Sequence, residues 1–281
     1  MKLLLDRIKL SLLKRTGIAQ KKKNYEWWQA KGYDNQPEVT FIFQTHNKSL
    51  EVCHVLEKLR RYEGSKEIIV IDDGSSPEHT RRLAKALTGP NDFLLRSNDL
   101  FEVVTYDRAV RMANGKYIAL MQDDDDFAGT SWVNRAVELF KKYPRMAILG
   151  GKQGSDVELR DGALHRVKTE AEGPFSFVCC VCRAPMWINK ELFDQYLHHN
   201  DFLFAPVQYD DDEICLRSWT LGLQVGRYDA RFRSLSAGGM RLWNRTLLSE
   251  QTVRNGKRLC ELYRDQMTTI QQKVDESNKA L

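Results

Sequence analysis

The sequence lacks the features that mark several large protein classes. Its 281 residues contain no apolar run close to the ~20 residues that a helix needs to span a bilayer. There is no G-x-G-x-x-G after the first predicted strand and no G-x-x-x-x-G-K-[ST] anywhere, which excludes the dinucleotide fingerprint and the P-loop. Any phosphate group that the protein binds must therefore be held chiefly by a cation and by basic side chains.

The six cysteines do not form a zinc motif. They contain no pair of C-x-x-C motifs, and the histidines do not stand at zinc-ligand spacing. Three of them lie in the apolar segment 175–182, which we expect to form one strand and where a reduced thiol behaves as a small buried hydrophobe. The N-terminus is also a poor secretory signal, because Asp6, Arg7 and Lys9 interrupt its apolar stretch. These features favour a cytoplasmic protein.

Positive charge is concentrated at the N-terminus. Residues 1–23 hold eight of the 43 Lys and Arg residues and one of the 38 Asp and Glu residues, a net charge of +7. The rest of the chain holds 35 basic and 37 acidic residues, a net charge of −2. The pI of 8.8 is therefore weak evidence for nucleic-acid binding, and we expect no nucleic-acid partner.

Residues 1–36 form a basic arm for which the sequence predicts a helix. Leu4, Leu5, Ile8 and Leu12 fall within about 100° on a helical wheel, enough for an apolar stripe. Two interpretations remain open. In one, the helix docks on the body or frays. In the other, it lies in the interface of an anionic membrane and holds the protein at its cytoplasmic face.

The middle of the chain alternates short apolar runs with helical patterns. The runs are bounded and rich in β-branched residues, which is typical of buried strands in a parallel sheet. They occupy residues 38–43, 68–71, 93–95, 117–122 and 147–149. We therefore predict an α/β fold in which a mostly parallel central sheet is flanked by helices.

Four consecutive carboxylates, Asp123 to Asp126, follow the predicted strand 117–122. Open α/β sheets bind ligands at the carboxyl ends of their strands. Adjacent carboxylates repel one another, and burying one without a partner is costly, so a divalent cation would resolve both problems. Mg2+ and Mn2+ prefer such oxygen ligands. The run predicts a metal–diphosphate site, with a solvated acidic turn as the alternative.

The ordered motifs resemble those of the family-2 glycosyltransferases, which have the Rossmann-like GT-A fold of nucleotide-diphospho-sugar transferases. The motifs are Thr45-x-Asn47 after the first strand, Asp72-Asp73-Gly74-Ser75 after the second, and Gly115-Lys116-Tyr117 leading to Asp123–Asp126. The resemblance covers about residues 37–240. It implies a nucleotide-binding half at 37–150 and an acceptor-binding half at 151–240, and leaves 241–281 as a C-terminal helical extension. In this extension we expect a polar helix from Leu247 to about Gln272 and a disordered end.

The resemblance also implies roles for single residues. It assigns the donor nucleotide to Thr45, Asn47, Asp72, Asp73, Arg96 and Asp124. It assigns a Mn2+ or Mg2+ ion to Asp123 and Asp125, although the four-residue run fits two registers.

In the second acidic cluster, the resemblance implies that Asp211 is the general base. Asp210 takes the place of the usual Glu, while Asp212 and Glu213 support the acceptor side. Trp243 belongs to a loop that supplies a metal-binding His in many relatives, but no His is present at 235–237.

The implied activity is inverting transfer of a sugar from a nucleotide-diphosphate sugar, with a UDP-sugar favoured. The acceptor would be a hydroxyl group of a glycan, a lipid-linked molecule or another compound, in polysaccharide, lipopolysaccharide or other glycoconjugate synthesis. Two alternatives remain: a non-catalytic nucleotide-sugar-binding protein on the same fold, and a metal-dependent nucleotidyltransferase. Residues 152–173 are expected to form a loop or short hairpin over the site, with basic residues that are solvated by default.

Overall fold

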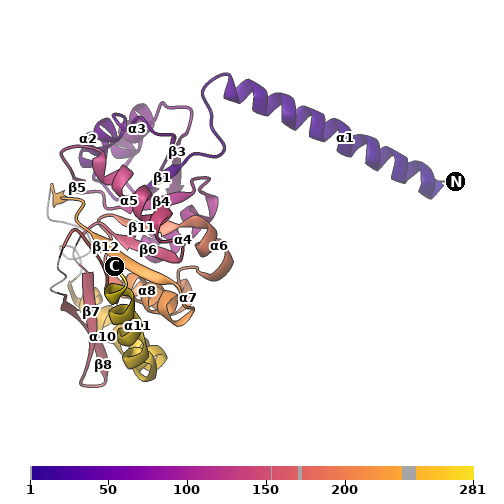
Figure 1. Ribbon diagram of the computed structural model, residues 1–281. Coiled ribbons are helices and arrows are strands. Elements are labelled where there is room, and N and C mark those ends of the chain that lie inside the picture. Colours follow the sequence, from indigo (N-terminus) through magenta and orange to yellow (C-terminus); the bar gives the residue numbers. More distant parts are fainter. Residues whose placement is uncertain (1, 153, 170–172, 236–244) are drawn as a thin grey trace. The chain divides into compact units, whose positions relative to one another are not determined.

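A computed structural model describes residues 2–152, 154–169, 173–235 and 245–281 (Figure 1). The chain divides into two compact units. The smaller contains Met1–Asn35 with Gly89–Asn91, and the larger contains Gln36–Thr88 with Asp92–Leu281.

The smaller unit is dominated by one helix, α1 (Lys2–Gln29), which confirms the predicted helix and extends it beyond the basic segment. The helix does not carry one apolar stripe. Leu10 and Leu13 are well exposed and, at 100° per residue, lie opposite Ile8 and Leu4. No helix among the described residues has the length and apolar character needed to cross a membrane. The helix therefore exposes leucines and cations on more than one side.

The larger unit is built on an eight-stranded sheet with the order β3-β2-β1-β4-β11-β6-β12-β9. Its strands are β1 (Val39–Thr45), β2 (Lys66–Asp73), β3 (Asp92–Ser97), β4 (Tyr117–Met121), β6 (Met146–Gly150), β9 (Phe175–Phe177), β11 (Met186–Asn189) and β12 (Gln224–Tyr228). The first four strands are mutually parallel, and β12 is parallel to β6. Only β11 and β9 run against their neighbours. The predicted mostly parallel sheet is confirmed.

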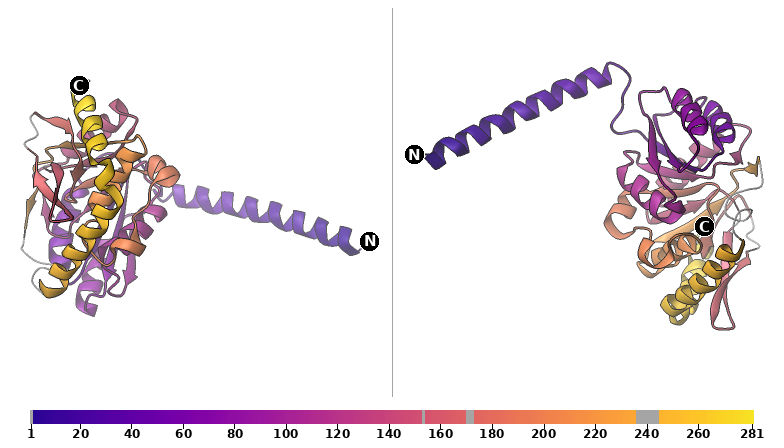
Figure 2. Two further views of the ribbon diagram at one scale, coloured as in Figure 1. Left: turned by 90° about the horizontal axis from the view of Figure 1, so that it is seen from below. Right: turned by 180° about the vertical axis from the view of Figure 1, so that it is seen from behind.

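Helices cover both faces of this sheet (Figure 2). One face carries α2 (Ser49–Leu59), α3 (Pro77–Ala86) and α5 (Ser131–Lys142). The other carries α4 (Phe101–Met112), α6 (Lys190–Tyr196), α7 (Asp201–Phe204), α8 (Asp210–Thr220), α10 (Arg245–Tyr263) and α11 (Met267–Lys279). Along β1 the side chains alternate between the faces, so Phe41 and Ile42 belong to different clusters.

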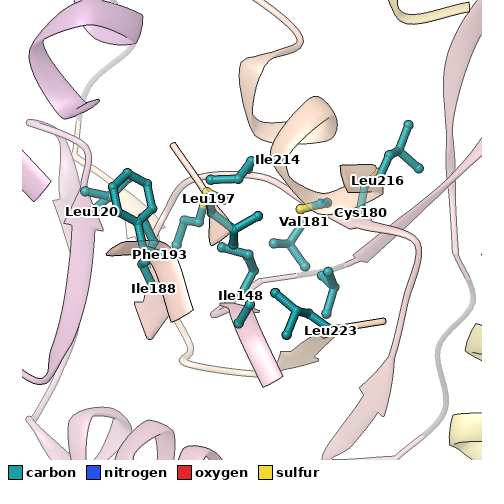
Figure 3. Packing of buried hydrophobic residues seen from close by; sticks show 14 of the residues in the cluster. Leu120, Ile148, Cys180, Val181, Ile188, Phe193, Leu197, Ile214, Leu216 and Leu223 are labelled. Carbon is teal, nitrogen blue, oxygen red and sulfur yellow. The ribbon is translucent and has the colours of Figure 1, made fainter. Parts of the chain in front are cut away.

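The second face fixes the position of α8. Ile148 and Ile188 of the sheet share one buried cluster with Ile214 and Leu216 of α8 (Figure 3). All four side chains are fully buried. Because α8 is packed in this way, its acidic first turn has a fixed place relative to the strands.

A separate three-stranded sheet has the order β10-β7-β8. A hairpin of β7 (Gly154–Arg160) and β8 (Ala163–Lys168) pairs with β10 (Cys180–Val181). The single strand expected at 175–182 is therefore wrong. The chain leaves the main sheet after β9 and joins β7 instead. A third, two-stranded sheet pairs β5 (Asp125–Asp126) with β13 (Arg233–Ser234).

The C-terminal region also differs from expectation. We expected one polar helix to about residue 272 and a disordered end, but α10 is followed by a 3-10 turn (Arg264–Gln266) and by α11. Ile270 and Val274 bury α11 against the core. The Asn278 side chain donates to the Phe177 carbonyl at 2.9 Å and accepts from its N–H at 2.8 Å. These contacts order the end of the chain.

Candidate active site

The predicted donor-side residues meet at the carboxyl edge of the main sheet. Thr45, the last residue of β1, pairs with Asp72 of β2, and Phe43 pairs with Met121 of β4. Thr45 is buried beside Asp123, which follows β4 by two residues. The structure thus brings the first, second and third motifs to one edge, as parallel strands require.

Asp72 organises the turn between β2 and α3. It is fully buried, and its two oxygens accept from the Ser75 N–H at 3.1 Å and the Thr80 hydroxyl at 2.5 Å. Arg96 donates to the Ser75 carbonyl at 2.9 Å, and its Nη1 lies 3.8 Å from Asp72. Asp72 and Arg96 therefore shape the same turn. Their predicted role as donor contacts stays a prediction.

Asp73 ties β2 to the elements beside it. Its Oδ1 accepts from the Ser97 hydroxyl at 2.7 Å and the Leu100 N–H at 3.0 Å. Its Oδ2 accepts from the Phe101 N–H at 2.9 Å and the Gln44 side chain at 2.8 Å. Each oxygen has two donors, so this side chain stabilises the start of α4 by accepting from its first N–H groups.

Asn47 links the first motif to the second. Its backbone N–H donates to the Ser75 hydroxyl at 2.8 Å, and its side-chain oxygen accepts from the Ser76 N–H at 2.8 Å. Asn47 has a φ of 57°, a left-handed conformation that Asn tolerates better than most residues. This linkage holds the β1–α2 and β2–α3 turns together.

The run of four carboxylates is divided by environment. Asp126 is fully buried and is bound by Lys58 and by Arg233, whose Nη2 lies 2.7 Å away. Burial opposes its ionisation, but hydrogen bonds from Lys58 and Arg233 outweigh burial and lower the pKa of Asp126 to about 2. A carboxylate already paired in this way is a structural anchor, which argues against the register that would give Asp126 to the metal.

Asp125 has one oxygen without a partner. Its Oδ2 accepts from the Gln122 N–H at 2.9 Å, while its buried Oδ1 accepts no hydrogen bond from any described residue. The nearest cation is the Lys152 ammonium group, 3.9 Å from Oδ1. Burial raises the pKa of Asp125 to about 7. A buried carboxylate oxygen in this state is suited to a cation.

Asp123 lies near it and is mostly buried. The Lys48 ammonium group donates to its Oδ1 at 3.2 Å, yet burial still raises the pKa of Asp123 above its usual range. Asp124 is half-buried, and its carbonyl accepts from the Leu235 N–H at 2.7 Å. Two oxygen donors, Asp123 and Asp125, thus fit a hard divalent cation. Within the described ranges no three His, Cys, Asp or Glu side chains are grouped to hold a metal ion.

The second acidic cluster opens α8, and its carboxylates have basic partners. Asp210 is bound by the buried Arg183 guanidinium. Asp212 accepts from Arg166 Nε at 2.6 and 2.7 Å, although burial still raises its pKa to about 6. Glu213 accepts from Arg217 at 2.9 Å and from the Tyr263 hydroxyl at 2.8 Å. Tyr263 lies in α10, outside the motifs found in the sequence.

Asp211 differs from its neighbours in exposure, since the side chains of Asp210, Asp212 and Glu213 keep only 1–2% of their surface exposed. Its Oδ1 accepts from Arg166 and from the Asp212 N–H, the latter at 3.1 Å. Its Oδ2 makes no hydrogen bond with the described parts of the chain, and the side chain keeps 11% of its surface exposed. The carboxylate is therefore oriented through Oδ1, and Oδ2 is left free of hydrogen bonds from these residues.

Buried side chains connect the two acidic clusters. Arg183 reaches from Asp210 to Glu102, at 3.1 Å, and lies over the Tyr106 ring at 4.7 Å. The Tyr106 hydroxyl donates to the Met121 carbonyl at 2.8 Å, just before the four-carboxylate run. These contacts link the first turn of α8 to the end of β4, directly before the four-carboxylate run.

Several residues of this site were missed or misread from the sequence. Arg166, interpreted as a solvated loop residue, binds Asp211 and Asp212. Lys48 and Arg183 carried no signal, because isolated basic residues in turns are common. The excess of acids at 210–213 did indicate that counter-charges were needed. Trp243 and positions 236 and 237 lie outside the described residues.

An open, mostly parallel sheet with two acidic clusters at its carboxyl edge is the arrangement of a GT-A glycosyltransferase. The chain belongs to the family described as glycosyl transferase family 2, whose profile matches residues 40–197. None of the curated proteins compared with the chain is significantly similar to it in sequence.

Solved structures share this fold. One is mannosyltransferase PcManGT from Pyrobaculum calidifontis in complex with GDP-Man and Mn2+, with a TM-score of 0.55 and 15% identity over 84% of this chain and 70% of that one. A second is S. aureus TarS 1–349, with a TM-score of 0.51 and 14% identity over 69% of this chain and 58% of that one. TarS 1–349 in complex with UDP-GlcNAc has a TM-score of 0.55 and 13% identity over 74% of this chain and 61% of that one. The chain thus spans less than two thirds of TarS 1–349.

Proposed function

We propose that this glycosyltransferase moves a sugar from a nucleotide-diphosphate sugar to an acceptor hydroxyl group with inversion at the anomeric carbon. The carrying observation is the state of Asp211, which is anchored through Oδ1 while Oδ2 accepts no hydrogen bond from the described residues. Its cluster is linked to the end of β4 through Arg183 and Tyr106. The presence of GDP-Man and UDP-GlcNAc in two similar structures supports a nucleotide-sugar donor.

In the proposed step, the acceptor oxygen attacks the anomeric carbon from the face opposite the diphosphate. Its proton passes to Asp211 Oδ2 as the new carbon–oxygen bond forms. The bond between the anomeric carbon and the diphosphate oxygen breaks, and the nucleoside diphosphate leaves with that electron pair. Arg166 holds the carboxylate in place during the transfer. A single displacement of this kind inverts the configuration.

We place a divalent cation, Mn2+ or Mg2+, on Asp123 and Asp125. The partnerless Oδ1 of Asp125 and the raised pKa of both carboxylates support this assignment. A bound cation would neutralise negative charge on the leaving diphosphate. Since these two carboxylates leave coordination positions open, donor phosphates and water would complete the shell.

A donor screen tests the proposal. The protein is incubated with Mn2+ and a panel of UDP-, GDP-, dTDP- and CMP-sugars, and the released nucleotide is identified. We expect slow release of a nucleoside diphosphate from one donor and its loss with EDTA. Release of a sugar 1-phosphate, with the nucleoside monophosphate transferred, would indicate nucleotidyl transfer and overturn the proposal. A rate unaffected by chelation would overturn the metal assignment.

We also propose that α1 attaches the protein to an anionic membrane surface. Its exposed leucines and two tryptophans, Trp27 and Trp28, supply apolar contact, and its eight cations supply electrostatic attraction. Removal of residues 1–29 should abolish cosedimentation with vesicles that contain phosphatidylserine. Equal binding by the full and shortened chains would reject this role.

A further inference from the structure

The turn that precedes the proposed base has an unusual backbone. Gln208 and Tyr209, directly before Asp210, have φ values of 78° and 66°. Residues other than glycine rarely adopt this left-handed conformation, and two in succession need support from surrounding structure. The turn also has three buried carbonyl groups, those of Phe204, Val207 and Gln208, which need donors.

One side-chain amide lies within hydrogen-bond distance of all three carbonyl oxygens and has two N–H groups to share among them. Asn255, in the middle of α10, is fully buried, and its Nδ2 lies 3.0, 2.9 and 2.9 Å from the carbonyl oxygens of Phe204, Val207 and Gln208. Its Oδ1 accepts from Arg254 Nε at 3.2 Å, which fixes the orientation of the amide. Arg254 also donates to the Ala205 carbonyl at 2.7 Å. The amide thus joins the two ends of the turn.

The same helix reaches the acidic turn of α8 by a second route. The Tyr263 hydroxyl donates to Glu213, two residues after Asp211. Gly256 packs so closely that an added Cβ would lie 3.6 Å from the Tyr209 hydroxyl. The Tyr209 ring in turn lies under the Arg166 guanidinium at 5.5 Å, and Arg166 binds Asp211. Helix α10 therefore contacts residues on both sides of the base, and Tyr209 connects it to Arg166, which holds the base.

We propose that Asn255 is a positioning residue for the general base, so that α10 is a working part of the active site. The helix lies outside the segment that matches the family profile, which ends at residue 197. The inference rests on the proposed function, because it concerns the placement of Asp211. Asn255 acts through the backbone of residues 204–208 and touches no substrate.

The test compares Asn255→Ala with Gln251→Leu in the full chain. Gln251 is a suitable control because it lies one turn earlier on α10, is also buried, and its Oε1 has no partner among the described residues. Hydrogen exchange is measured at residues 203–213, together with turnover and nucleotide affinity in Mn2+. For Asn255→Ala we expect exchange to rise about tenfold in this segment. We expect kcat to fall at least about tenfold with nucleotide affinity kept within about twofold.

Gln251→Leu should change neither the hydrogen exchange at residues 203–213 nor kcat. If Asn255→Ala fails to fold, Arg254→Met is used in its place, because Arg254 is half-exposed. This change removes the hydrogen bond to the Ala205 carbonyl and the contact that orients the Asn255 amide. We then expect kcat to fall about threefold. Unchanged exchange at 203–213, or unchanged kcat in a folded variant, would overturn the positioning role. Failure of the proposed function is a separate result, since it would appear in the parental protein as no turnover with any donor.

Discussion

Four chemically identical side chains, Asp123 to Asp126, have different environments within one short turn. Asp126 faces Lys58 and Arg233 and is held ionised, with its pKa lowered to about 2 against the effect of burial. Asp125 is equally buried, but one oxygen has no donor and burial raises its pKa to about 7. This difference supports the proposed division of roles, with Asp126 as an anchor and Asp125 as a cation ligand.

Substitution separates these two roles. Asp125→Ala should weaken Mn2+ binding by at least about tenfold, because it removes a cation ligand. Asp126→Ala should leave the metal ligands in place but lower the free energy of unfolding by about 2 kcal/mol, since it strands Lys58 and the more exposed Arg233. Calorimetric Mn2+ titration and urea unfolding check the two effects. The interpretation fails if the two variants lose metal affinity equally.

Asp211→Asn should remove transfer but keep donor binding. The amide has the shape of the carboxylate but cannot accept the acceptor proton, so kcat should fall about 10²- to 10⁴-fold. Donor affinity in Mn2+, measured by calorimetry, should stay within about twofold, because Asp211 is outside the metal site. A variant with near-parental kcat would reject Asp211 as the base.

Arg166 can be examined through a conservative change. Arg166→Ala leaves Asp211 and Asp212 close together without their shared cation, and should lower the free energy of unfolding by about 2 kcal/mol. Arg166→Lys restores the charge but cannot bind both carboxylates with fixed geometry, so stability should recover more than kcat. Arg160 gives a matched control, because it pairs with Glu158 at the exposed end of the same hairpin. Equal recovery of both quantities would contradict a positioning role.

At the scale of elements, the sequence was most informative where burial is continuous. The strands β1, β2, β4 and β6 are buried on both faces, and continuous apolar runs of this kind predict strands directly. The donor-side motifs could also be located, because acids and amides follow those strands directly. The residues that hold the acidic turn of α8 could not be located from the sequence. Arg166, Arg183 and Asn255 come from distant elements that only tertiary packing brings near.

The C-terminal helices show how tertiary packing overrides a weak local signal. Helix α11 is polar overall, and only Ile270 and Val274 are buried in it, which is too sparse a pattern to predict from periodicity. Chain ends are ordered when they are tied down in this way.

Ile270→Ala should therefore destabilise the whole larger unit. The side chain is 1% exposed, so its loss leaves a cavity in the core shared with α8, at a cost of about 2–4 kcal/mol. Val253→Ala on α10 removes a side chain that is 56% exposed, and should change stability by less than about 0.5 kcal/mol. Urea unfolding followed by tryptophan fluorescence measures both. An α11 that only decorates the surface would give the two variants similar stabilities.

At the scale of the whole molecule, charge and apolar exposure are unevenly divided between the two units. The first 23 residues carry +7 while the remainder carries −2. Exposed leucines occur within the same 23 residues, and two exposed tryptophans, Trp27 and Trp28, follow them on α1. An anionic bilayer would provide counter-charge for the cations of α1 and apolar contact for its exposed leucines and tryptophans.

The two contributions to membrane binding can be distinguished by salt. Neutralising Lys21, Lys22 and Lys23 as Gln should weaken binding to phosphatidylserine vesicles by about 3 kcal/mol at low salt, at about 1 kcal/mol for each charge near the surface. The deficit should shrink as added salt shortens the Debye length to about 8 Å at physiological strength. Replacing Leu10 and Leu13 by Ser should weaken binding at every salt concentration, because apolar burial is not screened. If both variants respond to salt alike, the helix is not an interfacial anchor, and its exposed leucines must be covered by something other than lipid.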